Sequence, residues 1–132
     1  MPSTMKHRFS LIARIRSFRY AIYGIAVMLT SQHNAWLHAV ATITIVGLGA
    51  SFGLSTGEWC WLVLAIMAVW TAEALNTALE LLADVASPAF HPLVKQAKDV
   101  AAGAVLISAC GATVIGALIL GPRLLAFCGF LK

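Results

Sequence analysis

The chain has 132 residues, of which 61% are hydrophobic and only 11% are charged. Because soluble domains carry about 25% charged residues, this composition excludes an ordinary soluble protein and predicts an all-α membrane protein with one domain over residues 1–132. The net charge of +4 arises largely from a basic N-terminus, where bulky apolar residues separate the charges. That spacing argues against a nucleic-acid partner and favours contact with an anionic membrane surface. The residues concerned are Lys6, Arg8, Arg14, Arg16 and Arg19.

Residues 8–30 are predicted to form an amphipathic helix that lies on the membrane surface. Its apolar stripe is imperfect, but its three arginines favour a surface position over a span. A signal peptide is the competing interpretation, because the segment has a basic start and an apolar part. Tyr20, Tyr23 and Gly24 interrupt that apolar part, and no small-residue cleavage site follows.

Three apolar segments follow, each about long enough to cross a hydrocarbon layer of roughly 30 Å. The predicted spans are residues 36–54, 58–86 and 99–120. Breaks are expected at residues 31–34, at the turn and cap of 55–58, and at the proline-containing 87–92. Gly49 and Gly53 form a GxxxG pattern, which weakly predicts close helix packing. Gly121 and Pro122 are expected to end the third span.

Basic residues indicate the orientation. Seven of the nine lie in the N-terminal arm or in residues 87–98, and none lies in residues 55–58. With three spans, both basic regions fall on one side, so we expect a cytoplasmic N-terminus and an external C-terminus. The second span is roughly 43 Å long, which exceeds the hydrocarbon thickness, so its polar end should protrude.

The second predicted span carries its polar residues on one stripe. At 100° per residue, Asn76, Glu80 and Asp84 lie within about 60° of Glu73. A carboxylate in hydrocarbon costs a few kcal/mol or more, so the stripe predicts a site that binds cations or moves protons. A polar seam between helices is an alternative, although Ser, Thr or Asn would serve there at lower cost. A non-enzymatic protein that conducts protons or cations along the stripe is the rival function.

The depth of the stripe suits a reaction between a lipid and a soluble substrate. Glu73 lies roughly 10 Å deeper than Glu80, where a general base can take the proton of a lipid hydroxyl. Nearer to water, Glu80, Lys98 and Asp99 are placed to bind a phosphate donor with Mg²⁺. The nucleotide motifs GxxxxGK[ST] and GxGxxG are absent from the sequence.

Two motifs resemble those of the prokaryotic diacylglycerol kinase and undecaprenol kinase family. The pattern E-x-x-N-[ST]-A-[IL]-E matches residues 73–80, and A-K-D-x-x-[AG]-[AG]-A-V-L matches residues 97–106. The resemblance extends over about residues 14–120 and leans towards the undecaprenol kinase branch. It implies a homotrimeric helical bundle in the bacterial inner membrane, with active sites shared between subunits. It also implies ATP- and Mg²⁺-dependent phosphorylation of a lipid alcohol, undecaprenol or diacylglycerol, at the cytoplasmic face.

The resemblance assigns roles to individual residues. Glu73 is the expected catalytic base, with Asn76 in the same active site. Asp84 is expected there from its position on the stripe. Glu80 is the expected metal ligand, and Gln32 stands where the family often has a second metal-binding glutamate. The Gln32 amide should bind metal more weakly and without charge. Nucleotide contacts are expected at Tyr20, Gln32, Glu80, Ala89, Phe90, His91, Lys98 and Asp99.

The remaining polar and aromatic residues have structural interpretations. His38, the only titratable residue of the first predicted span, is expected to be a polar packing residue. The cysteines show no metal-binding spacing and are expected to be buried thiols, with a Cys60–Cys128 disulfide left open. Interface or lipid-facing positions are expected for Trp59, Trp61 and Trp70.

Overall fold

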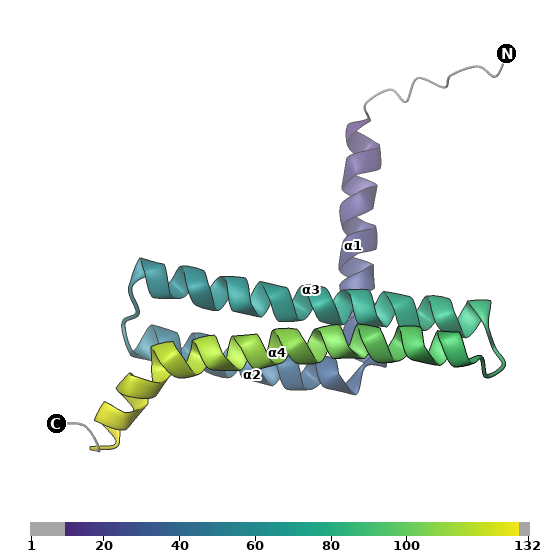
Figure 1. The fold of residues 1–132 in the computed structure, drawn as a ribbon. Coiled ribbons are helices and arrows are strands. Elements are labelled where there is room, and N and C mark those ends of the chain that lie inside the picture. Colours follow the sequence, from purple (N-terminus) through teal and green to yellow (C-terminus); the bar gives the residue numbers. More distant parts are fainter. Residues whose placement is uncertain (1–9, 130–132) are drawn as a thin grey trace, which may run out of the picture.

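The computed structural model describes residues 10–129, and every regular element in this range is an α-helix. Three helices, α2 (His33–Ser51), α3 (Thr56–Ala86) and α4 (Pro92–Phe127), run side by side, and α1 (Leu11–Ser31) stands crosswise to them (Figure 1). Each of the three is long and apolar enough to cross a membrane. The prediction of an all-α integral membrane protein with three spans is therefore confirmed.

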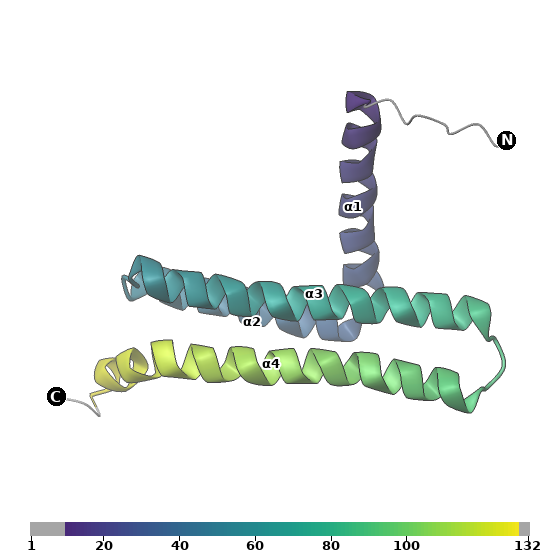
Figure 2. The same ribbon diagram turned by 45° about the horizontal axis from the view of Figure 1, so that its top comes forward.

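One residue makes the corner between α1 and α2. Gln32 has extended backbone angles, with φ −115° and ψ 118°, and α2 begins at the next residue. The predicted four-residue break is therefore too long, because Ser31 still belongs to α1 and His33 already belongs to α2. Figure 2 shows the crosswise position of α1 from a second direction. The predicted start of this helix, residue 8, lies outside the described residues.

The two glycines of the GxxxG pattern have separate functions. Gly49 is buried on α2, where a Cβ would lie 2.9 Å from the ring of Trp59 on α3. Gly53 lies beyond α2 with φ +62°, a left-handed conformation that favours glycine just after a helix. Only Gly49 therefore mediates close packing, and the first span ends at Ser51 rather than at residue 54 because the chain turns at Gly53.

A capping box starts α3. The Ser55 hydroxyl accepts a hydrogen bond from the backbone N–H of Glu58 at 3.4 Å, and Glu58 Oε2 accepts one from the backbone N–H of Ser55 at 2.8 Å. The predicted cap is confirmed, although the helix begins two residues earlier than predicted, at Thr56. The 31 residues of α3 extend about 46 Å, which exceeds a hydrocarbon layer of roughly 30 Å.

The last helix, α4, is longer than predicted at both ends. It begins at Pro92 rather than at residue 99, because proline is well suited to a first helical turn, where its missing N–H is not needed. The prediction that Gly121 and Pro122 end the helix is wrong, since Pro122 lies inside α4, which continues for five more residues. The end of α4 instead bends away from the bundle (Figure 1), as expected next to a proline.

An ion pair supports this continuation of α4. Arg123 Nη1 lies 2.7 Å from Glu58 Oε1, and Arg123 Nη2 donates to Glu58 Oε2 at 3.0 Å. Arg123 also donates to the backbone oxygen of Ile119 at 2.9 Å. The side chain thus joins α4 to the start of α3 and binds the helix backbone beside the proline, where a backbone hydrogen bond is missing.

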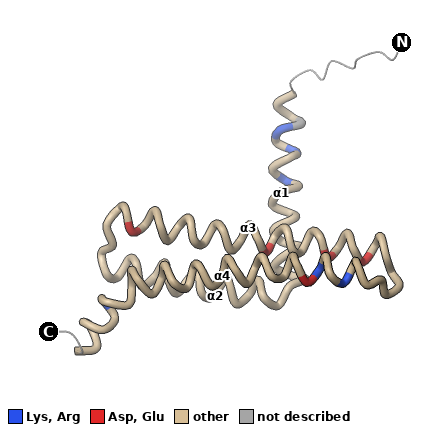
Figure 3. The backbone as a smooth tube through the Cα atoms, in the orientation of Figure 1, with Lys and Arg blue, Asp and Glu red and all other residues tan. Residues whose placement is uncertain are grey.

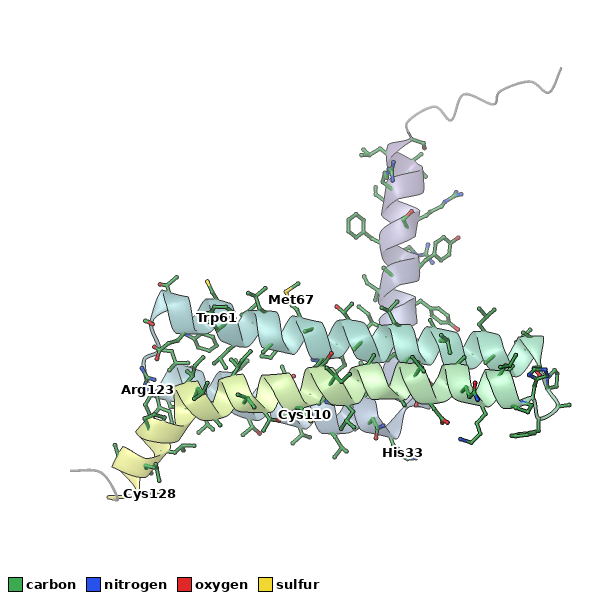
Figure 4. All side chains as sticks on the ribbon, viewed as in Figure 1. His33, Trp61, Met67, Cys110, Arg123 and Cys128 are labelled. Atoms are coloured by element: carbon green, nitrogen blue, oxygen red, sulfur yellow. The ribbon has the colours of Figure 1, made fainter. Side chains whose placement is uncertain are left out.

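The buried apolar cluster and most charged residues of α3 and α4 lie towards different ends of the bundle. The buried cluster of Leu54, Leu62 and Leu120 lies near the α2–α3 turn. Apart from the Glu58–Arg123 pair, most charged residues of α3 and α4 gather towards the opposite end, and basic residues lie along α1 (Figure 3). Along α3, large apolar side chains such as Trp61 and Met67 point outward (Figure 4). Such outward apolar faces are expected where helices contact lipid or another subunit.

Two predictions for single side chains are wrong. Trp70 does not face lipid, because its ring is half-buried and Nε1 donates to Thr42 Oγ1 on α2 at 3.1 Å. The three cysteines are exposed rather than buried, and Cys60 and Cys128 are free rather than joined. On a membrane-spanning helix an apolar thiol can face outward, since lipid replaces the protein core as its apolar surroundings.

Candidate active site

Glu73 lies buried on α3 without a hydrogen-bond partner. The residue is 1% exposed, and among the described residues neither carboxylate oxygen has a partner. Asn76, one turn further, is 6% exposed, and its Oδ1 is likewise unpartnered. Thr77 is satisfied locally, because its hydroxyl donates to the backbone oxygen of Glu73 at 2.9 Å. Buried acceptors without partners are costly, so these oxygens mark a candidate ligand site.

A histidine from α2 faces this carboxylate. His38 Nε2 lies 3.9 Å from Glu73 Oε2, and the His38 side chain is 18% exposed. Sequence reasoning treated His38 as a packing residue and missed its position beside Glu73. The sequence contained one indication of a functional position, because His38 is the only titratable residue within the first predicted span.

Three of the predicted site residues meet two turns from Glu73. Gln32 Nε2 donates to Glu80 Oε2 at 2.7 Å, and Asn76 Nδ2 donates to Glu80 Oε1 at 3.4 Å. The corner between α1 and α2 brings Gln32 to α3 from 48 positions away in the sequence.

The charged residues of α4 bind different partners. Lys98 Nζ lies 3.0 Å from Asp84 Oδ1 on α3, whereas Lys95 Nζ lies 2.6 Å from Asp99 Oδ2 within α4. The first pair joins the two helices at the end of the stripe, and the second is local. Exposed ion pairs contribute little stability, so a charged ligand can replace them at small cost.

The other predicted nucleotide contacts lie further from the carboxylates. Ala89, Phe90 and His91 lie in the loop between α3 and α4, where Phe90 is 80% exposed and His91 caps α4 through its side chain. This loop begins fourteen residues beyond Glu73, or about 21 Å along the helix. Tyr20 is 72% exposed on α1, beside two arginines. The single chain does not bring these residues into contact with Glu80.

Two apolar cavities lie between α3 and the other spans. One, of about 470 Å³, lies between α2, α3 and α4, and His38 forms part of its wall. The other, of about 630 Å³, lies between α3 and α4, and Asn76 forms part of its wall. Most other lining side chains are apolar, among them Ile45, Val69 and Leu75. Apolar cavities that reach buried polar groups suit a ligand with a long apolar chain and a polar end.

The residues present can hold a magnesium ion jointly with phosphate. Among the described residues, no three acidic, histidine or cysteine side chains form a preformed metal site. Mg²⁺ bound together with a phosphate ligand needs only one or two carboxylates. Glu80 supplies one, and the unpartnered Asn76 Oδ1 and the Gln32 amide are neighbouring oxygen donors. This donor set fits Mg²⁺.

Fold and site together define a three-span membrane protein with a buried carboxylate, adjoining apolar cavities and a cluster of charge at one end. The family model for prokaryotic diacylglycerol kinase matches residues 19–120, which is most of the chain. The chain therefore belongs to the prokaryotic diacylglycerol kinase family and is a lipid kinase.

Two relatives support this assignment. The chain is 38% identical to undecaprenol kinase of Bacillus subtilis (strain 168) over 118 residues. This alignment covers 89% of the chain and 96% of the relative. The chain is 36% identical over 111 residues to diacylglycerol kinase of Synechocystis sp. (strain ATCC 27184 / PCC 6803 / Kazusa), which covers 83% of this chain and 63% of the relative. The family resemblance predicted from the two motifs is confirmed.

Proposed function

We propose that this lipid kinase transfers the γ-phosphate of ATP to the hydroxyl of a membrane lipid alcohol at the cytoplasmic face of a bacterial inner membrane. The observation that carries the proposal is the buried, unpartnered Glu73 carboxylate, whose neighbours His38 and Asn76 each line an apolar cavity. Undecaprenol is the first candidate substrate, because the relative that aligns over 96% of its length is an undecaprenol kinase. Diacylglycerol is the second, from the other relative.

Glu73 acts as the general base in this proposal. Its carboxylate takes the proton of the lipid hydroxyl while the hydroxyl oxygen attacks the γ-phosphorus. The bond from that phosphorus to the bridging oxygen breaks, and ADP leaves with the electron pair. Asn76 Oδ1 is an unpartnered acceptor one turn away and can orient the same hydroxyl. Burial of both side chains excludes water, which would otherwise compete as the nucleophile.

The nucleotide is proposed to bind at the Glu80 end of the stripe. Phosphoryl transfer depends mainly on positioning and charge neutralisation, and Mg²⁺, when bound, would supply part of that neutralisation. Glu80 and Gln32 would hold the ion, and Lys98 would exchange Asp84 for a phosphate oxygen. Further nucleotide contacts are proposed at Tyr20, Ala89, Phe90, His91 and Asp99.

A conduit for protons or cations fits the bundle less well than a kinase does. A conduit requires polar groups that continue from the stripe through the rest of the membrane. The far end of the bundle instead holds the apolar cluster of Leu54, Leu62 and Leu120. The fourteen residues of α3 between Glu58 and Glu73 contain no charged side chain that could connect the Glu58–Arg123 pair to the stripe. The Lys98–Asp84 pair and the amide contacts to Glu80 suit phosphate and metal binding, which a conduit does not need.

The orientation and assembly are also proposals. A cytoplasmic N-terminus and a surface position for α1 are supported by the arginines of α1 and by its crosswise direction (Figure 1). The loop between α3 and α4 would then lie on the cytoplasmic side. A homotrimer with shared sites would give partners to the outward apolar faces and could bring Tyr20 or the 87–91 loop of one subunit towards another subunit's Glu80.

The test is phosphorylation by the purified protein with labelled ATP and Mg²⁺, with undecaprenol and diacylglycerol offered separately. Glu73→Gln should lower turnover by about 10² or more, because the amide cannot accept the proton, while nucleotide binding persists. Glu58→Gln is the matched control, since it removes a carboxylate at the other end of α3 and should leave turnover unchanged. Near-normal turnover in Glu73→Gln would refute the base assignment.

A further inference from the structure

His38 and Glu73 face each other across the interface between α2 and α3. His38 Nε2 is 3.9 Å from Glu73 Oε2, and both carboxylate oxygens lack a hydrogen-bond partner among the described residues. Glu80 lies two turns further along α3 on the same face as Glu73. Because Glu80 already accepts two amide hydrogen bonds, the imidazole is the group best placed to orient the Glu73 carboxylate.

Polar contacts on both sides hold this arrangement in register. Trp70 donates to Thr42 at 3.1 Å on one side, and Gln32 donates to Glu80 at 2.7 Å on the other. Thr42 in turn donates to the backbone oxygen of His38 at 2.7 Å. Along the two antiparallel segments, Gln32 therefore faces Glu80, His38 faces Glu73 and Thr42 faces Trp70. This register keeps the imidazole opposite the buried carboxylate.

We propose that His38 is a positioning residue for Glu73, whose carboxylate it orients by donating its Nε2 hydrogen to Oε2. The other oxygen, Oε1, is then left to take the proton of the lipid hydroxyl. This inference rests on the proposed role of Glu73 as the base. The separation of 3.9 Å must close by about 1 Å to form a hydrogen bond, and catalytic hydrogen bonds are often long before substrate binds.

Protonation of the imidazole gives this role a measurable consequence. An imidazolium would pair with the carboxylate and make it a weaker base, so turnover should fall as His38 becomes protonated. Among the described residues, the charged group that faces His38 is Glu73 on α3. The α4 side chains that share its cavity are uncharged, and no α1 side chain lines that cavity.

The test compares His38→Leu and His38→Gln with the wild type, and uses His33→Gln as a matched control on the same helix. His38→Leu should lower kcat about tenfold or more, a part of the general-base contribution, with an unchanged KM for ATP. His38→Gln should recover most of kcat, because its amide can donate the same hydrogen bond. The dependence of kcat on pH should differ from the wild type in His38→Gln, whereas His33→Gln should keep the wild-type dependence.

Wild-type kcat in His38→Leu, or a wild-type pH profile in His38→Gln, overturns the positioning role. If a thermal melt shows that His38→Leu does not fold, the His38→Gln profile alone decides. Glu73→Gln is measured alongside to separate the two proposals. An active Glu73→Gln means that the base assignment fails, whereas an inactive Glu73→Gln with normal His38 variants means that only the positioning role fails.

Discussion

A glutamate at position 32 would set a second carboxylate against Glu80. In the structure, the Gln32 amide donates to Glu80 Oε2 at 2.7 Å, so a neutral side chain satisfies the carboxylate without a cation. Gln32→Glu replaces this hydrogen bond with repulsion between like charges. A divalent cation placed between the two carboxylates would turn that repulsion into attraction, so the variant should bind Mg²⁺ more tightly than the wild type.

The expected change in Mg²⁺ affinity follows from the distance between the two carboxylates and from the burial of Glu80. Two like charges about 4 Å apart repel by about 1 kcal/mol in water and by about 4 kcal/mol at an effective dielectric constant of 20. Glu80 is half-buried, so its repulsion with the carboxylate introduced at position 32 falls between these limits. Because 1.4 kcal/mol corresponds to a factor of ten, we expect the Mg²⁺ concentration for half-maximal activity to fall by about tenfold in Gln32→Glu. Glu80→Gln should raise it or abolish turnover.

The assay is a Mg²⁺ titration of lipid phosphorylation at saturating ATP. Gln96→Glu, the same substitution on an exposed position of α4, is the matched control and should leave the midpoint unchanged. Calorimetry without nucleotide should show little Mg²⁺ binding to the wild type, because Glu80 is the only carboxylate of this contact. An unmoved midpoint in Gln32→Glu would show that Gln32 is not near the ion. An unmoved midpoint in Glu80→Gln as well would remove the metal site from this stripe.

Three further predictions concern packing, topology and the end of the bundle. Gly49→Val should destabilise the protein by about 1–3 kcal/mol, because the added side chain overpacks against the indole ring of Trp59. Gly47→Ala should not destabilise it, since a Cβ at Gly47 meets nothing within 4 Å. Thermal melts of the two variants test this difference. For the topology, two variants each keep a single cysteine, one introduced at Ser87 and the other the native Cys128. A membrane-impermeant thiol reagent should label the first from the cytoplasm and the second from outside. Labelling of both from one face would contradict three spans. Arg123→Met should lower the melting temperature but leave kcat unchanged, and a large loss of turnover would show that the far end of the bundle takes part in catalysis.

Local patterns in the sequence were enough to predict much of this protein. The composition predicted three apolar helices, because a membrane span needs only length and hydrophobicity. The α3 helix ends at Ala86 as predicted, since the loop before Pro92 breaks the helix locally. The stripe from Glu73 to Asp84 followed from helical periodicity alone, and the two motifs on α3 and α4 indicated the family that the comparisons confirmed.

Only the tertiary structure decided which distant residues meet. A single extended residue, Gln32, turns α1 across the bundle and brings its own amide to Glu80, and no local pattern encodes that contact. The position of His38 opposite Glu73 depends on the register between α2 and α3, which side chains on both helices set together. The continuation of α4 past Pro122 was likewise visible only in the structure, where Arg123 pairs with Glu58 at the start of α3. Periodicity places a residue on a face of its own helix, but the packing of helices determines what that face contacts.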